Sequence, residues 1–210
     1  KRAAVITFDD GFFGSFENGL SILDNLGIPS IFFLNMRAIV KQMPILSATA
    51  CYLEKYSSQF CEYANRNGIA RPYHLHLTPL TLSTYCEHHE KIDWASILTY
   101  QGQFATLEMV KKWDDQGSVN FGNHLYDHWN APALTVQELE DQYFKNESLL
   151  KPLKHKINLF AFTNGQPNTC YTCRDIRLIK RFGAQKVFSS SGGVNNKVDG
   201  FVLERLGFGP

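Results

Sequence analysis

The feature that most constrains the fold is a repeated alternation of short apolar runs with amphipathic helical segments. The apolar runs lie at residues 4–8, 28–35, 118–124, 157–163, 185–190 and 201–208. Most of them are separated by a segment with helical spacing of its apolar residues. Parallel strands need a long crossover connection, which is usually a helix, so this alternation is typical of parallel sheets. The pattern therefore predicts an α/β protein, either a barrel or a doubly wound sheet.

The ends of the helical segments carry their own signals. Thr106 is a candidate N-cap for a helix that Gly117 ends. Thr135 with Glu138 fits a capping box, which would open a helix running to about residue 150. A third helix is predicted over residues 173–182, closed by Gly183.

Residues 36–103 interrupt the alternation. They are rich in Tyr, His, Cys and Gln and lack a clear strand pattern. We interpret them as a mostly helical insertion in one domain spanning residues 1–210. Its histidines are candidates to line a substrate groove: His74, His76, His88 and His89.

Composition narrows the classes of function. The chain has 210 residues, 44% of them hydrophobic, with 21 basic and 20 acidic residues and a net charge of +1. Nucleic-acid binding needs a clustered basic face, and an integral membrane segment needs about 18 consecutive apolar residues, so neither is expected. The five cysteines are an odd number, which favours reduced thiols and a cytoplasmic location, with a secreted or periplasmic location as the alternative. The oligomeric state stays unknown.

Two polar clusters follow apolar runs. Asp9 and Asp10 follow the first run, whereas His124 ends the third run and His128 follows it. The carboxyl ends of parallel strands meet at one face, so these clusters are expected to lie close together. Two His and one carboxylate form a common open metal site. The alternatives are helix capping by the acids and a surface or core position for the histidines.

Three motifs resemble those of a known family. The stretches VITFDDGF (residues 5–12), GNHLYDH (122–128) and LFAFTNG (159–165) are similar, in order and spacing, to successive motifs of the polysaccharide deacetylases, carbohydrate esterase family 4. The likeness covers about residues 4–35 and 104–210. It implies a distorted (β/α) barrel with about seven strands, a divalent metal, and removal of acetyl groups from N- or O-acetylated sugars.

The resemblance also assigns roles to single residues. It implies that Asp10, His124 and His128 bind the metal, most simply Zn²⁺, and that Asp9 is the general base. A metal-bound water would attack the acetyl carbonyl of an N-acetylated polysaccharide or glycan precursor.

Three further residues complete the implied site. The backbone N–H of Asn164 is the implied donor to the oxyanion of the tetrahedral intermediate. Trp129 and Phe162 are the implied substrate contacts, with Trp129 preferred as the ring that packs on a sugar.

The chain also departs from the family pattern. Leu125 replaces the Ser or Thr that usually stabilises the loop between the two histidines, a role for which Asp127 and Asn123 are candidates. Ala161 replaces an arginine that orders the catalytic aspartate in many members. No histidine follows His155, so the family's C-terminal general acid is missing, and Arg205 cannot donate a proton in its place.

The missing acid leaves other functions open. One alternative is a non-catalytic carbohydrate-binding relative. Another is an amidohydrolase or deformylase that acts on a C–N bond outside a sugar. If the chain is a deacetylase, a histidine of the insertion, a metal-bound water or a residue beyond position 210 would supply the proton.

Overall fold

Six parallel strands form one sheet in the computed structural model, which describes residues 4–88 and 92–207. The order of the strands in the sheet is their order in the chain. His89 and the last residue of the predicted strand 201–208 lie outside the described residues. The strands are β1 (Ile6–Asp10), β2 (Ser30–Leu34), β3 (Val119–Asn123), β4 (Lys156–Ala161), β5 (Lys186–Phe188) and β6 (Val202–Leu203).

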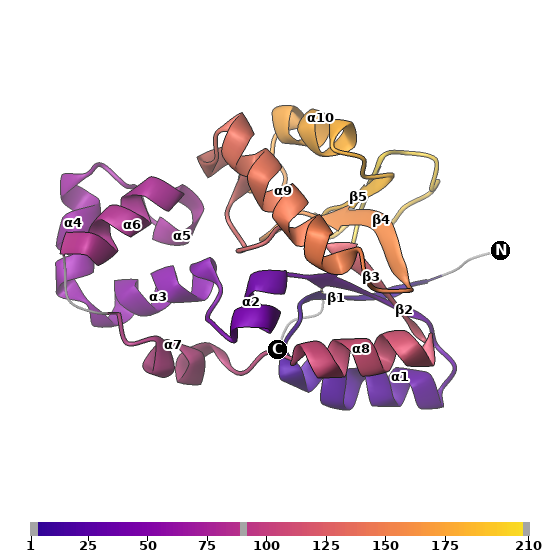
Figure 1. Cartoon of the computed structure of the whole chain (residues 1–210). Helices are drawn as coiled ribbons and strands as arrows, with labels where there is room; N and C mark the ends of the chain where they lie inside the picture. Colours follow the sequence, from indigo (N-terminus) through magenta and orange to yellow (C-terminus); the bar gives the residue numbers. More distant parts are fainter. Residues whose placement is uncertain (1–3, 89–91, 208–210) are drawn as a thin grey trace.

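The sheet is an open half-barrel (Figure 1). Strands β1 and β6 are its two edges, since they do not pair with each other among the described residues. The α/β barrel class is therefore confirmed, but the described residues form six strands, a little fewer than the expected count of about seven. The first three strands are level at their carboxyl ends, where Asp10 pairs with Leu34 and Leu34 with Asn123. This register places the carboxyl ends of β1 and β3 at the same edge of the sheet, on either side of β2.

The first strand differs from its prediction. It begins at Ile6 rather than at residue 4, and it includes both Asp9 and Asp10. Its side chains are mostly half-buried, whereas every residue of β2 is buried. The reason is position: β1 is an edge strand, covered on fewer sides than the strand beside it.

Helices pack against the sheet and begin and end where the sequence signals lie. Thr106 caps α8 (Leu107–Gln116), which Gly117 ends in a left-handed conformation. Thr135 and Glu138 form the predicted capping box of α9 (Val136–Leu150). The remaining elements here are a π-helix (Ser15–Leu20), α1 (Ser21–Asn25), a 3-10 helix (Ala131–Ala133) and α10 (Cys173–Arg181). In Figure 1, α1 and α8 lie together near β1 and β2, while α9 and α10 lie near β4 and β5.

Between β2 and α8 the described residues form helices and no strand. These are α2 (Met36–Lys41), α3 (Leu46–Tyr56), α4 (Ser58–Arg66), α5 (Tyr73–His76), α6 (Pro79–His88) and α7 (Trp94–Gln101). Helices α3 to α6 form a lobe beside the sheet (Figure 1). The lobe shares one apolar core with the sheet, in which Phe60 and Tyr73 lie with Trp129 and Phe160. In the described part of the chain, no helix is long and apolar enough to cross a membrane.

Candidate metal centre

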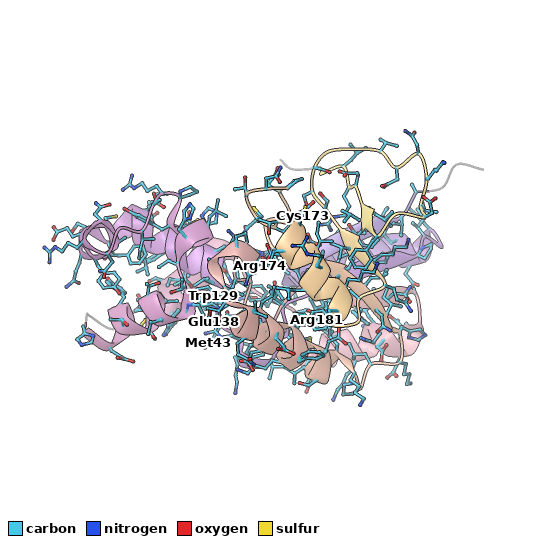
Figure 2. The ribbon with its side chains drawn as sticks, turned by 90° about the horizontal axis from the view of Figure 1, so that it is seen from above. Met43, Trp129, Glu138, Cys173, Arg174 and Arg181 are labelled. Carbon is cyan, nitrogen blue, oxygen red and sulfur yellow. The ribbon has the colours of Figure 1, made fainter. Side chains whose placement is uncertain are left out.

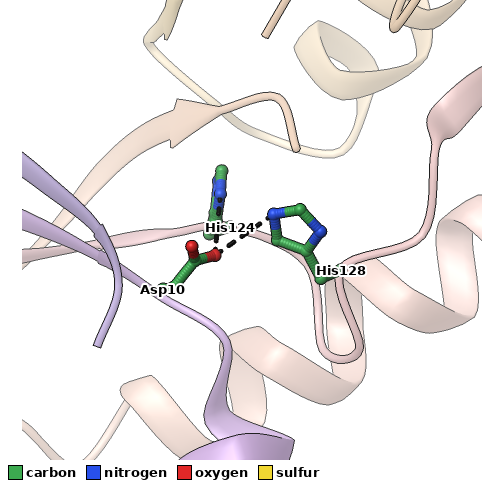
Figure 3. A group of neighbouring side chains, drawn as sticks. All are labelled: Asp10, His124 and His128. Atoms are coloured by element: carbon green, nitrogen blue, oxygen red, sulfur yellow. Dashed lines mark ion pairs between the residues drawn. The ribbon is translucent and has the colours of Figure 1, made fainter. Parts of the chain in front are cut away.

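Three side chains converge at the carboxyl ends of β1 and β3. Oδ1 of Asp10 lies 3.5 Å from Nε2 of His124 and 3.2 Å from Nε2 of His128 (Figure 3). The three potential ligand atoms all lie within 4.8 Å of one another. Both histidines are almost fully buried, and the carboxylate is 18% exposed. The structure thus brings together the three residues that the resemblance implied as ligands.

Hydrogen bonds orient the two imidazoles. Nδ1 of His124 lies 2.8 Å from the carbonyl oxygen of Ala161, to which it donates, and this bond leaves Nε2 as the lone-pair nitrogen. Nδ1 of His128 lies 3.1 Å from the hydroxyl of Ser47 on α3. Oδ1 of Asp10 is buried and has no hydrogen-bond partner among the described residues. An orphaned carboxylate oxygen facing two oriented ring nitrogens fits a divalent cation.

The charges in this cluster are strongly coupled. Burial alone would raise the pKa of Asp10, but His128 and His124 outweigh that effect and hold this pKa well below its usual range. Burial would lower the pKa of His124, but the carboxylates of Asp9 and Asp10 raise it. The centre therefore keeps Asp10 ionised, as a metal ligand has to be.

The ligand loop, residues 124–130, has a strained backbone. Leu125 has a φ of 62° and His128 a φ of 52°, and Asp10 opposite them has a φ of 69°. Left-handed conformations are uncommon for residues other than Gly, Asn and Asp, and they persist only where the surroundings enforce them. Asn35 supplies part of this enforcement, since its side-chain amide donates to the carbonyls of His124 and Leu125.

Two residues brace the loop in place of the usual Ser or Thr. Oδ1 of Asn123 accepts a bond of 2.9 Å from the backbone N–H of Leu125. The carboxylate of Asp127 accepts a bond of 2.9 Å from Arg37. Burial raises the pKa of Asp127 to about 6, although Arg37 acts to lower it. Both candidates named from the sequence therefore stabilise the loop.

Asp9 has a different environment from Asp10. Its two carboxylate oxygens accept bonds of 2.7 and 2.8 Å from the guanidinium of Arg205. Its side chain is 30% exposed. On a regular strand the two acids would point to opposite faces. The left-handed φ of Asp10 ends the extended conformation there, and the carboxylate of Asp9 stays close enough to His124 to raise the pKa of that histidine.

Asn164 lies in the turn after β4. It has a φ of 61°, and its side-chain nitrogen is buried without a hydrogen-bond partner among the described residues. The carbonyl of Ala161, three residues earlier, orients His124. The turn that carries Asn164 thus begins at the metal centre.

The two implied sugar contacts are not at the surface. Trp129 is 4% exposed and lies between the helical lobe and α9 (Figure 2). Phe162 is 1% exposed and stacks on Tyr171, with ring centroids 4.4 Å apart. Their assignment as substrate contacts was wrong, because both rings are used in the apolar core and present no face to a sugar.

Two residues near the centre had no role in the sequence prediction. Ser47 contacts His128 from the insertion, and Arg205 contacts Asp9 from the last described segment. His74 also belongs to the insertion, and its Nδ1 lies 3.7 Å from the sulfur of Cys51. Burial first and then the charge of His128 lower the pKa of His74. Ser47 and His74 thus place part of the insertion beside His128.

Comparison with known proteins identifies the family. The sequence profile described as polysaccharide deacetylase matches residues 1–185, which is most of the chain. The chain therefore belongs to the polysaccharide deacetylase family. No match was found among curated proteins.

Solved structures of deacetylases share the fold. The Streptococcus pyogenes deacetylase PplD in complex with acetate aligns with a TM-score of 0.61 at 12% identity, over 98% of this chain and 64% of that one. IcaB from Ammonifex degensii aligns with a TM-score of 0.60 at 17% identity, over 98% and 67%. A de-N-acetylase from Aggregatibacter actinomycetemcomitans gives 0.55 at 13%, over 96% and 68%. The chain thus spans about two thirds of these proteins.

Proposed function

We propose that the chain is a metal-dependent hydrolase that removes acetyl groups from an N-acetylated polysaccharide or glycan precursor. The observation that carries the proposal is a second carboxylate, that of Asp9, which lies outside the Asp10, His124 and His128 cluster but adjoins it in the chain. Family membership supports the reaction type. The similar structures named as deacetylases support the fold on which such a site is built.

Zn²⁺ is the ion that we propose for the centre. One carboxylate and two imidazole nitrogens are a common zinc ligand set that leaves positions open for water and substrate. When bound there, the ion would lower the pKa of water and polarise a carbonyl.

Asp9 is the proposed general base. Its carboxylate would accept a proton from the attacking water, which requires hydrogen-bond reach to that water. Both oxygens already accept from Arg205, but a carboxylate has about four lone-pair positions, so capacity remains on the exposed side. Asn164 is the proposed oxyanion donor through its backbone N–H, because its turn follows directly from the strand end at the centre.

Metal analysis joined to an acetate-release assay tests the proposal. We expect about one zinc-like ion per purified chain, with release of acetate from N-acetylated chitooligosaccharides. A chelator should abolish the release, and added zinc should restore it. Binding of the oligosaccharides without acetate would instead indicate a carbohydrate-binding relative. Hydrolysis of formyl or imide compounds without acetate release would indicate an amidohydrolase of another class.

A further inference from the structure

Arg205 has an unusually complete set of contacts. Nε donates to the carbonyl of Ser189 at 3.2 Å, and the two terminal nitrogens hold the two oxygens of Asp9. The terminal nitrogens also donate to the hydroxyls of Thr7 and Ser190 at 3.2 and 3.1 Å. A guanidinium has five N–H groups, and here five bonds are made. The side chain is only 12% exposed.

These contacts span the gap in the half-barrel. Thr7 and Asp9 belong to the edge strand β1, whereas Ser189 and Ser190 follow β5. Arg205 itself comes two residues after β6, the other edge. Where backbone pairing between β1 and β6 is absent in the described structure, one side chain connects the two edges.

The surroundings hold the guanidinium in place. It lies 5.6 Å above the ring of Phe33, which is fully buried. Gly122 makes room for that ring, since a Cβ at this position would lie 2.6 Å from Phe33. On the other side, the backbone N–H of Ser190 donates to the carbonyl of Gly165 at 2.8 Å. The guanidinium is therefore supported from the sheet below and from the turn beside it.

We infer that Arg205 is a positioning residue, which fixes the carboxylate of Asp9 and joins the open edges of the sheet. The inference rests on the proposed function in that Asp9 is taken as the base. Arg205 lies outside residues 1–185, the part of the chain that matches the family profile. The last segment, which lacks a histidine, thus has a role in the site that is distinct from proton donation.

The geometry favours arginine over any other residue. A planar guanidinium binds a carboxylate through two parallel bonds, which prevents rotation of the carboxylate. Lysine offers a single point charge on a flexible stem and cannot reproduce this fork. Loss of a contact that positions a catalytic group should lower the rate strongly, because a misplacement of about 1 Å can lower the rate by roughly 10²-fold.

Kinetics of Arg205 variants test the positioning role. We expect Arg205→Ala to lose about 10²-fold in kcat with little change in KM or metal content. Millimolar guanidinium should restore part of the kcat, because it can refill the vacated position. Arg205→Lys should keep the charge and still be impaired. Arg174→Gln, which removes an arginine that pairs with Asp175 on α10, is the matched control and should keep wild-type kcat. A wild-type kcat in Arg205→Lys, or the absence of rescue in Arg205→Ala, would overturn the inference.

A stability cycle tests the same pair without substrate. The cycle compares unfolding free energies of four metal-free proteins: the wild type, Arg205→Gln, Asp9→Asn and the variant that carries both changes. If the two side chains hold each other, the double variant should be less destabilised than the sum of the single variants. Additive effects would contradict the inference. If the wild type releases no acetate, the proposed function fails, while this cycle still decides whether Arg205 holds Asp9.

Discussion

The ligand loop and the C-terminal segment, residues 189–207, both follow strands of the same sheet, but they are held in different ways. In the ligand loop Leu125, Trp129 and Asn130 are all less than 5% exposed. In the C-terminal segment Val194 and Val198 are each 72% exposed. The loop carries two of the proposed metal ligands, which have to stay within a narrow geometry, whereas the segment has to deliver the side chain of Arg205. Burial is thus concentrated in the loop that carries the two histidines.

Removal of a ligand should give the largest difference between the two regions. We expect His128→Ala to lose bound metal and all acetate release, since the remaining Asp10 and His124 leave the ion with two protein ligands. Metal content by mass spectrometry and an acetate assay would measure this. Asn195→Ala is the matched change in the C-terminal segment, where Asn195 bonds to the backbone of Glu204.

Asn195→Ala, the control, should retain its metal and most of its activity.

Ser47→Ala should give an intermediate result, because loss of a ligand's hydrogen-bond partner typically lowers metal affinity by roughly 10–100-fold. Equal loss of metal in His128→Ala and Asn195→Ala would remove the distinction between the regions.

The stability of the ligand loop should depend on pH through Asp127. Its pKa is raised to about 6 in the folded protein, from an ordinary value of 3.8. The folded state therefore binds this proton more tightly than the unfolded state. The resulting stabilisation is complete below about pH 4 and is lost as the pH rises through about 6. Two pKa units correspond to about 3 kcal/mol of unfolding free energy.

Urea unfolding of the metal-free protein between pH 4 and pH 8 would measure this effect. We expect the stability of the wild type to decline relative to Asp127→Asn over that range, because the variant has no carboxyl group to titrate. If the stabilities of the wild type and Asp127→Asn changed with pH in parallel, Arg37 would fully offset the cost of burying the charge of Asp127. The difference in stability between the wild type and Asn195→Ala should not change with pH, because both proteins carry Asp127.

The same contrast explains what the sequence could predict. Local signals determined the strands, the helix caps and the two clusters, because periodicity and capping act over a few residues. Ser47 contacts His128 over 81 positions and Arg205 contacts Asp9 over 196, so no spacing rule connects them. Trp129 was misassigned for a related reason. An aromatic residue beside a site has the same letter whether its ring faces a sugar or the core, and only tertiary packing decides.

The smallest expected effect lies at Lys186 on β5, which contacts the C-terminal segment. Its ammonium donates to three backbone carbonyls, those of Val198, Asp199 and Gly200, at 3.0, 3.0 and 2.7 Å. These bonds are exposed, and the carbonyls can turn to water when the lysine is removed. We therefore expect Lys186→Met to cost about 1 kcal/mol of unfolding free energy, with metal content unchanged. If the variant also lost kcat, the segment would have to be more rigid than its exposure indicates, because the position of Arg205 would then depend on this surface contact as strongly as the ligands depend on theirs.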